Sequence, residues 1–175
     1  MDDLRRMGAA ALGRAIGAGE VCPVELEEAF SEAIAAHPEG ARIYARATRT
    51  RARDEAMGAR LRAKANNRRG PLDGVPVSWK DLFDSAGVAT EAGSRLLAGR
   101  VPERDCPVLE AGTLAGLVCL GKTHMSELAF AGLGLNPMTA TPPNIHDPDA
   151  VPGGSSSGAA ASVAFGLAAA AVGSR

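Results

Sequence analysis

The chain is poor in aromatic residues, and this limits what its core can be made of. Phe, Trp and Tyr together make up 3% of the 175 residues, although 46% of the residues are hydrophobic. The core must therefore be built mainly from alanine, valine, leucine and isoleucine. Small side chains of this kind let backbone segments approach closely, which is typical of layered α/β folds rather than of aromatic-rich β-sandwiches.

Cysteine is also scarce. Cys22, Cys106 and Cys119 lie far apart, with no CxxC pair and no Cys/His spacing typical of zinc sites. An odd number of cysteines argues against a disulfide framework. We therefore expect three reduced cysteines that serve packing, no metal and no cofactor.

A strong net charge is absent, because 19 basic residues nearly balance 20 acidic ones. The chain as a whole is therefore not attracted to nucleic acid or to an anionic membrane. Locally, bases outnumber acids between Arg51 and Arg69. No aromatic residue is interleaved there for base stacking, so we interpret this stretch as a solvated helix face and expect no nucleic-acid partner.

Long uninterrupted hydrophobic runs are missing as well. The segment from Met1 to Arg6 has acids where a signal peptide carries bases. The nearly apolar stretch 158–173 is rich in alanine and glycine and is shorter than the ~18 residues of a membrane span. We expect no membrane contact and a cytoplasmic location.

The spacing of hydrophobic residues predicts helices that alternate with short strands in one domain. The expected helices cover residues 4–16, 23–37, 48–65, 107–114, 124–131 and 159–171. The expected strands cover residues 75–80, 117–120 and a segment after residue 171. The long irregular stretch 132–154 is of a length that is usually functional in a compact domain. This order of elements predicts an α/β fold.

Lys80 ends the apolar strand 75–80, and sites in α/β sheets gather at the carboxyl ends of strands. A lysine buried there would have a lowered pKa, because burial disfavours the charged form, and the neutral amine could act as a general base. The alternative is a surface lysine that closes the strand.

The sequence Gly-Gly-Ser-Ser-Ser-Gly, residues 153–158, precedes the last expected helix. Three interpretations remain open from the residues alone: a flexible linker, a nest of backbone N–H groups for an anion, or a serine proton relay in a tight glycine turn. The pattern of a Walker loop is absent, which excludes that kind of nucleotide site.

Four segments in order resemble the amidase-signature family. They are Gly74–Asp81 with Lys80, Gly121–Glu127, Gly132–Pro137 and Pro152–Gly158 with Ser155. The 75 positions from Lys80 to Ser155 also match the family's spacing. The resemblance implies a layered α/β/α fold with a mixed sheet. Residues 1–175 would form the N-terminal part of a single domain, with the sheet incomplete on its C-terminal side.

The resemblance also implies hydrolysis of a carboxamide by a Ser–cis-Ser–Lys triad. Lys80 would be the base, and Ser155, in a cis peptide with Gly154, would pass the proton. A second serine, in a downstream Asp-Thr-Gly-Gly-Ser-like motif, would attack the amide carbonyl. Gly153, Gly154, Ser156 and Met125 would bind substrate or support the loop. The expected partners are a small amide and, as a homo-oligomer, further copies of the chain.

The attacking serine is expected beyond Arg175, and Ser174 lies too close to Ser155 to be assigned as a substitute. We therefore expect the chain to be truncated and inactive by itself. Two alternatives remain. One is the amidase subunit of a tRNA-dependent amidotransferase, although Ala129–Leu135 stands where that subunit has a Gly-Ser-Ser segment. The other is a non-catalytic remnant.

Overall fold

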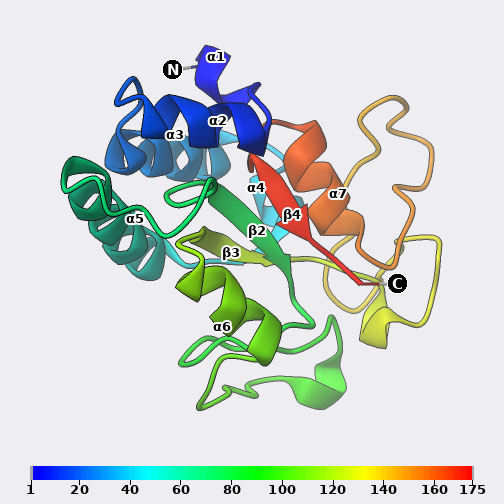
Figure 1. Cartoon of the computed structure of the whole chain (residues 1–175). Coiled ribbons are helices and arrows are strands. Elements are labelled where there is room, and N and C mark those ends of the chain that lie inside the picture. Colours follow the sequence, from blue (N-terminus) through cyan, green and yellow to red (C-terminus); the bar gives the residue numbers. More distant parts are fainter. Residues whose placement is uncertain (1, 175) are drawn as a thin grey trace.

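The computed structural model describes residues 2–174, which fold around a four-stranded mixed sheet (Figure 1). The strand order across the sheet is β1-β3-β2-β4. The strands are β1 (Tyr44–Ala47), β2 (Pro76–Lys80), β3 (Val118–Thr123) and β4 (Ala170–Val172). Strand β2 pairs in parallel with both β3 and β4, whereas β1 runs antiparallel to β3. Two segments far apart in sequence, β2 and β4, are thereby brought side by side.

Helices surround this sheet (Figure 1). Helix α7 contacts β2, β3 and β4, helix α5 contacts β3, and α3 packs beside α5. In chain order the helices are α1 (Asp2–Arg5), α2 (Ala9–Gly17), α3 (Pro23–Ala36), α4 (Gly40–Ile43), α5 (Arg49–Lys64), α6 (Pro107–Leu114) and α7 (Ser157–Ala164), with 3-10 turns η1 (Arg95–Leu97) and η2 (Glu127–Ala129).

Helix α3 shows how the sequence specifies a helix here. Pro23 stands in the first turn, where its missing N–H costs nothing and its fixed φ suits the helix. Leu26, Phe30 and Ile34 recur every fourth residue and are all buried in the main hydrophobic core. The predictions for this helix, for α5 and for α6 are confirmed.

All five residues of β2 are buried, so the strand is covered on both faces. On one face, Trp79 packs edge-on against Phe83 and lies against Gly112 of α6, where a Cβ would come within 2.9 Å of the indole ring. On the other face, Ser78 Oγ lies 2.7 Å from Ser162 Oγ of α7. Lys80 shares the face of Ser78, because successive side chains of a strand alternate. The strand predicted over residues 75–80 is confirmed, since β2 covers Pro76–Lys80.

Three predictions of regular structure are wrong. The segment 4–16 is two helices, because the backbone of Gly8 is extended before α2. The segment 124–131 has only the 3-10 turn η2, because its backbone N–H groups serve other partners, such as the bond from His124 N to the carbonyl of Ile43. Helix α7 ends at Ala164 instead of residue 171, and β4 begins earlier than expected, after Gly166 adopts a positive φ.

The basic segment is not only a solvated face, which corrects a further expectation. Arg51 of α5 forms a two-pronged ion pair with Asp105, at 2.9 and 2.7 Å. Arg62 pairs in the same way with the buried Asp73, at 2.9 and 2.6 Å. The Arg62–Asp73 ion pair connects α5 to the loop before β2, and the Arg51–Asp105 ion pair connects it to the loop before α6. Strand β1 was also missed, because four residues are too few for a clear alternation.

Within residues 2–174 the three cysteines form no disulfide bond with one another, and Cys119 is buried. Among these same residues there is no helix of sufficient length and hydropathy to cross a membrane.

Candidate active site

Lys80, at the carboxyl end of β2, is the centre of the candidate site. Its side chain is fully buried. The Nζ atom donates a hydrogen bond to Ser155 Oγ at 2.7 Å and another to Ser174 Oγ at 2.8 Å. The contact predicted between Lys80 and Ser155 is therefore confirmed, and the alternative of a surface lysine is wrong.

Ser155 lies in the glycine-serine turn before α7. The Gly154–Ser155 peptide bond is cis, as expected, and Ser155 is 8% exposed. Hydrogen bonds to the preceding segments hold this turn in place. Ser126 N donates to the carbonyl oxygen of Ser155 at 3.0 Å, and Gly153 N donates to the carbonyl oxygen of Leu133 at 3.1 Å. This is an ordered segment with tertiary partners, so the interpretation as a flexible linker is wrong.

Gly154 permits a close backbone approach at this turn. A Cβ added there would lie 2.7 Å from the backbone N of Gly134 and 2.9 Å from Ser126 Oγ, closer than real contacts. Gly158, at the start of α7, has equally little room, since a Cβ would come within 2.6 Å of Ile43 O. The glycines therefore let the loop 132–154 and the strand end pack directly against the serines.

Ser156 and Ser174 form the other side of the site. The hydroxyl of Ser156 accepts a bond from the backbone N–H of Ser174 at 3.1 Å and donates to its carbonyl at 2.9 Å. Sequence reasoning missed Ser174, because separation along the chain from Ser155 says nothing about where β4 lies. No sequence pattern signals this contact: residues 170–172 form a strand parallel to β2, and only this pairing in the folded sheet places the end of the strand beside Lys80.

The electrostatics of the site follow from burial. Burial lowers the pKa of Lys80 below its ordinary value of 10.5, because the charged amine loses hydration. Ser155 and Ser174 bind Lys80 through hydroxyl groups, which carry no charge to offset this loss. The neighbouring Asp81 binds Lys122 and Arg46 instead. A buried lysine between two serines is suited to accept a proton from a hydroxyl.

Met125 supports the loop rather than lining an open surface. Its side chain is fully buried, and its carbonyl accepts a bond from Asn136 Nδ2 at 2.7 Å. The same amide group donates to Gly93 O at 2.8 Å. Among the expected support residues, Gly153, Gly154 and Ser156 lie at the turn itself. Within residues 2–174, no cluster of three or more His, Cys, Asp or Glu side chains could hold a metal ion.

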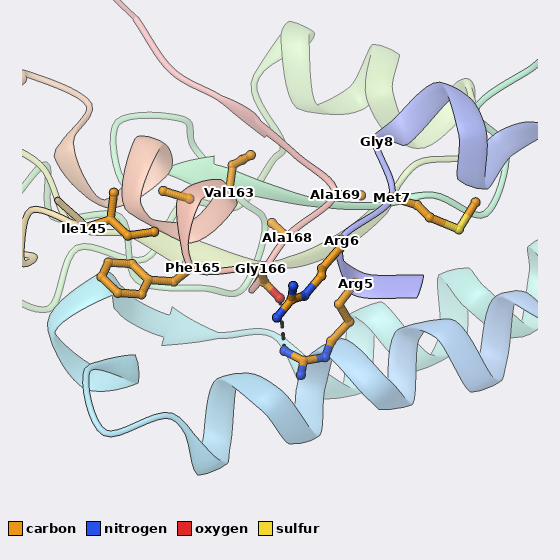
Figure 2. A pocket seen from close by; sticks show the side chains of 11 residues that line it. Arg5, Arg6, Met7, Gly8, Ile145, Val163, Phe165, Gly166, Ala168 and Ala169 are labelled. Atoms are coloured by element: carbon orange, nitrogen blue, oxygen red, sulfur yellow. Dashed lines mark hydrogen bonds between the residues drawn. The ribbon is translucent and has the colours of Figure 1, made fainter. Parts of the chain in front are cut away.

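A separate cavity of about 580 Å³ lies at the other end of the sheet (Figure 2). Its lining includes Arg5, Phe165 and Ala168, and Arg5 donates to the carbonyl of Gly166 at 3.2 Å. Phe165 follows the last turn of α7, whereas Ser155 precedes the first. The cavity therefore contains none of the predicted site residues.

Comparison with known proteins agrees with this geometry. The family model described as Amidase matches residues 25–175. The chain belongs to the amidase family. The fold is likewise shared: a solved structure described as an amidase superposes with a TM-score of 0.85 at 32% identity, over 95% of this chain and 38% of that one. The mixed α/β architecture of the amidase-signature fold is thereby confirmed.

Two other amidase relatives show how much of a longer protein the chain matches. A glutamyl-tRNA(Gln) amidotransferase subunit from Anaeromyxobacter dehalogenans is 40% identical over 164 residues, which are 94% of this chain and 33% of that protein. The peptide amidase of Stenotrophomonas maltophilia superposes with a TM-score of 0.83 at 32% identity, over 92% of this chain and 34% of that one. The chain spans about a third of the length of these relatives.

Proposed function

We propose that the protein hydrolyses the C–N bond of a carboxamide, with Lys80 and Ser155 as a proton relay. The observation that carries the proposal is the 2.7 Å contact between Lys80 Nζ and Ser155 Oγ in a buried site. A proton can cross a contact of this length directly, and burial favours the neutral, proton-accepting amine.

In the proposed reaction, a second serine of the family's downstream motif attacks the carbonyl carbon. Its proton passes to Ser155 Oγ while the proton of Ser155 passes to Lys80 Nζ. A C–O bond forms to the acyl group, and the tetrahedral intermediate then releases the amine. The amine leaves with the proton returned from Lys80 through Ser155. Water next cleaves the acyl ester and yields the carboxylic acid.

The test uses a protein that carries this chain together with the family's downstream serine motif, and it follows ammonia release from simple carboxamides. Lys80→Ala is expected to lower kcat about 10²–10⁴-fold, the usual contribution of a positioned proton acceptor. Lys64→Ala is the matched control, because Lys64 is exposed on α5. Unchanged turnover in Lys80→Ala would show that Lys80 is not the base.

A second candidate function is that of the amidase subunit in a tRNA-dependent amidotransferase. It is favoured by the curated relatives, since glutamyl-tRNA(Gln) amidotransferase subunits from Anaeromyxobacter dehalogenans and Thermobifida fusca are 40% and 37% identical over 94% of this chain. Against it stands the segment Ala129–Leu135, where a Gly-Ser-Ser segment is expected for that subunit.

The two candidates differ in what accepts the released ammonia. A stand-alone amidase releases ammonia freely from carboxamides without a partner. An amidotransferase subunit binds other subunits and delivers ammonia to a tRNA-linked acyl group. Affinity purification from the source cells, followed by a glutaminase assay with and without the co-purified proteins, separates them. Turnover of the isolated protein that equals that of the assembly favours the stand-alone amidase.

A further inference from the structure

Lys80 makes a second hydrogen bond that the proposed relay does not use. Its Nζ donates to Ser174 Oγ at 2.8 Å, in addition to the bond to Ser155. Ser174 follows β4, the strand that pairs with β2 next to Lys80. The amine is thus held between two hydroxyl groups that come from opposite ends of the segment 155–174.

Ser174 is itself fixed by Ser156. The Ser156 hydroxyl bonds both the N–H and the carbonyl of residue 174, at 3.1 and 2.9 Å. Gly173 makes this approach possible, since a Cβ there would lie 2.7 Å from Ser156 Oγ. The turn that presents Ser155 therefore also sets the position of the second hydroxyl.

The hydrogen bond to Ser174 can fix the direction in which the lone pair of the Lys80 amine points. Neutral Lys80 has two N–H donors and one lone pair. When one N–H is held by Ser174 Oγ, rotation about the terminal C–N bond is restricted, and the lone pair can be kept toward Ser155. After Lys80 takes up the proton, Ser174 Oγ still accepts from the ammonium group and stabilises it. Ser174 gains and loses no proton in either state.

We infer that Ser174, locked by Ser156, is a positioning residue that orients Lys80 for proton transfer from Ser155. This inference rests on the proposed function of Lys80 as the base. It assigns Ser174 a role through Lys80 and no contact with the substrate.

The test measures the protonation of Lys80 directly, by NMR of the 175-residue chain labelled at lysine. The chain has three lysines, Lys64, Lys80 and Lys122, so the side-chain signals can be assigned by single substitutions. Ser174→Ala is expected to move the titration midpoint of Lys80 to lower pH, because the ammonium loses an acceptor. Ser174→Thr keeps the hydroxyl and is expected to retain the wild-type midpoint.

Ser156→Ala provides an independent variant if Ser174→Ala does not fold. It is expected to move the titration midpoint of Lys80 in the same direction. The double variant Ser156→Ala/Ser174→Ala is expected to move this midpoint no further than Ser174→Ala alone does. Ser157→Ala is the control, because the buried Ser157 hydroxyl has no hydrogen-bond partner among the described residues. An unchanged Lys122 signal shows that the sheet is intact.

The outcomes separate this inference from the proposed function. A wild-type Lys80 whose titration midpoint is not lowered below 10.5 would remove the basis for Lys80 as a neutral base and overturn both. A lowered wild-type midpoint that stays unchanged in folded Ser174→Ala or Ser156→Ala would overturn the positioning role alone.

Discussion

Lys80 and Lys122 lie on neighbouring strands and are both fully buried, yet they face opposite sides of the sheet. Lys122 of β3 stands beside Trp79 of the adjacent strand β2, and Trp79 is the residue before Lys80. Residues at the same register position of neighbouring parallel strands point to the same side of the sheet, so Lys122 and Lys80 point to opposite sides. Lys80 meets two hydroxyl groups, whereas Lys122 lies 3.3 Å from Asp81 Oδ1 and 2.8 Å from Thr90 Oγ1. The same residue type thus stands in two chemically different settings.

The two lysines are expected to differ in their effect on stability. Lys122→Met removes a charged partner from the buried Asp81 and should lower the free energy of unfolding by about 3 kcal/mol, the low end for a broken buried pair, because Arg46 remains. Lys80→Met removes hydrogen bonds to neutral hydroxyls and should cost about 1 kcal/mol. Urea unfolding of both variants measures this difference, and equal losses would contradict it.

Ser155 and Ser157 stand two residues apart in one turn and form a matched pair. Ser155→Ala breaks the proposed relay and should lower kcat about 10²–10⁴-fold. Ser157→Ala removes a buried hydroxyl that bonds to nothing within residues 2–174, and it should leave kcat near the wild-type value. Ammonia release from a carboxamide is measured for both variants in a protein that also carries the family's downstream serine motif. A larger loss in Ser157→Ala would mean that the relay is assigned to the wrong serine.

Gly154 should tolerate no side chain. A Cβ there would lie 2.7 Å from the backbone N of Gly134, so Gly154→Ala should destabilise the fold by about 1–3 kcal/mol. Gly132→Ala in the same loop is the control, because a Cβ there meets nothing within 4 Å. Thermal unfolding followed by circular dichroism compares the two. The close packing of the turn would be refuted by equal midpoints.

Turnover should rise with pH. Lys80 accepts a proton only when neutral, and the neutral fraction grows as pH rises through its pKa. Burial lowers that pKa below 10.5, so the rise is expected at lower pH than for an exposed lysine. A pH profile of kcat/KM measures this rise. A rate that falls between neutral and mildly alkaline pH, in protein that remains folded, would exclude neutral Lys80 as the base.

Much of this protein could be predicted from local patterns. The helix with Leu26, Phe30 and Ile34 follows from 3.6-residue spacing, and the two faces of the strand ending at Lys80 follow from alternation. The residues alone left a surface lysine and three interpretations of the Gly-Ser segment open, and it was the resemblance of four motifs to the amidase-signature family that selected Lys80 and Ser155 as a pair. Each motif is local, because it depends on residues a few positions apart.

Other features were decided only by tertiary structure. The segment after Thr123 has helical composition, yet its backbone groups bond to Ile43 and Ser155, so it forms a single 3-10 turn. Strand β1 exists because Tyr44 and its neighbours pair with β3, a partner far along the chain. Ser174 meets Lys80 because β4 pairs in parallel with β2. Pairing between distant segments has no period in the sequence, and therefore only the folded sheet brings this second serine to the lysine.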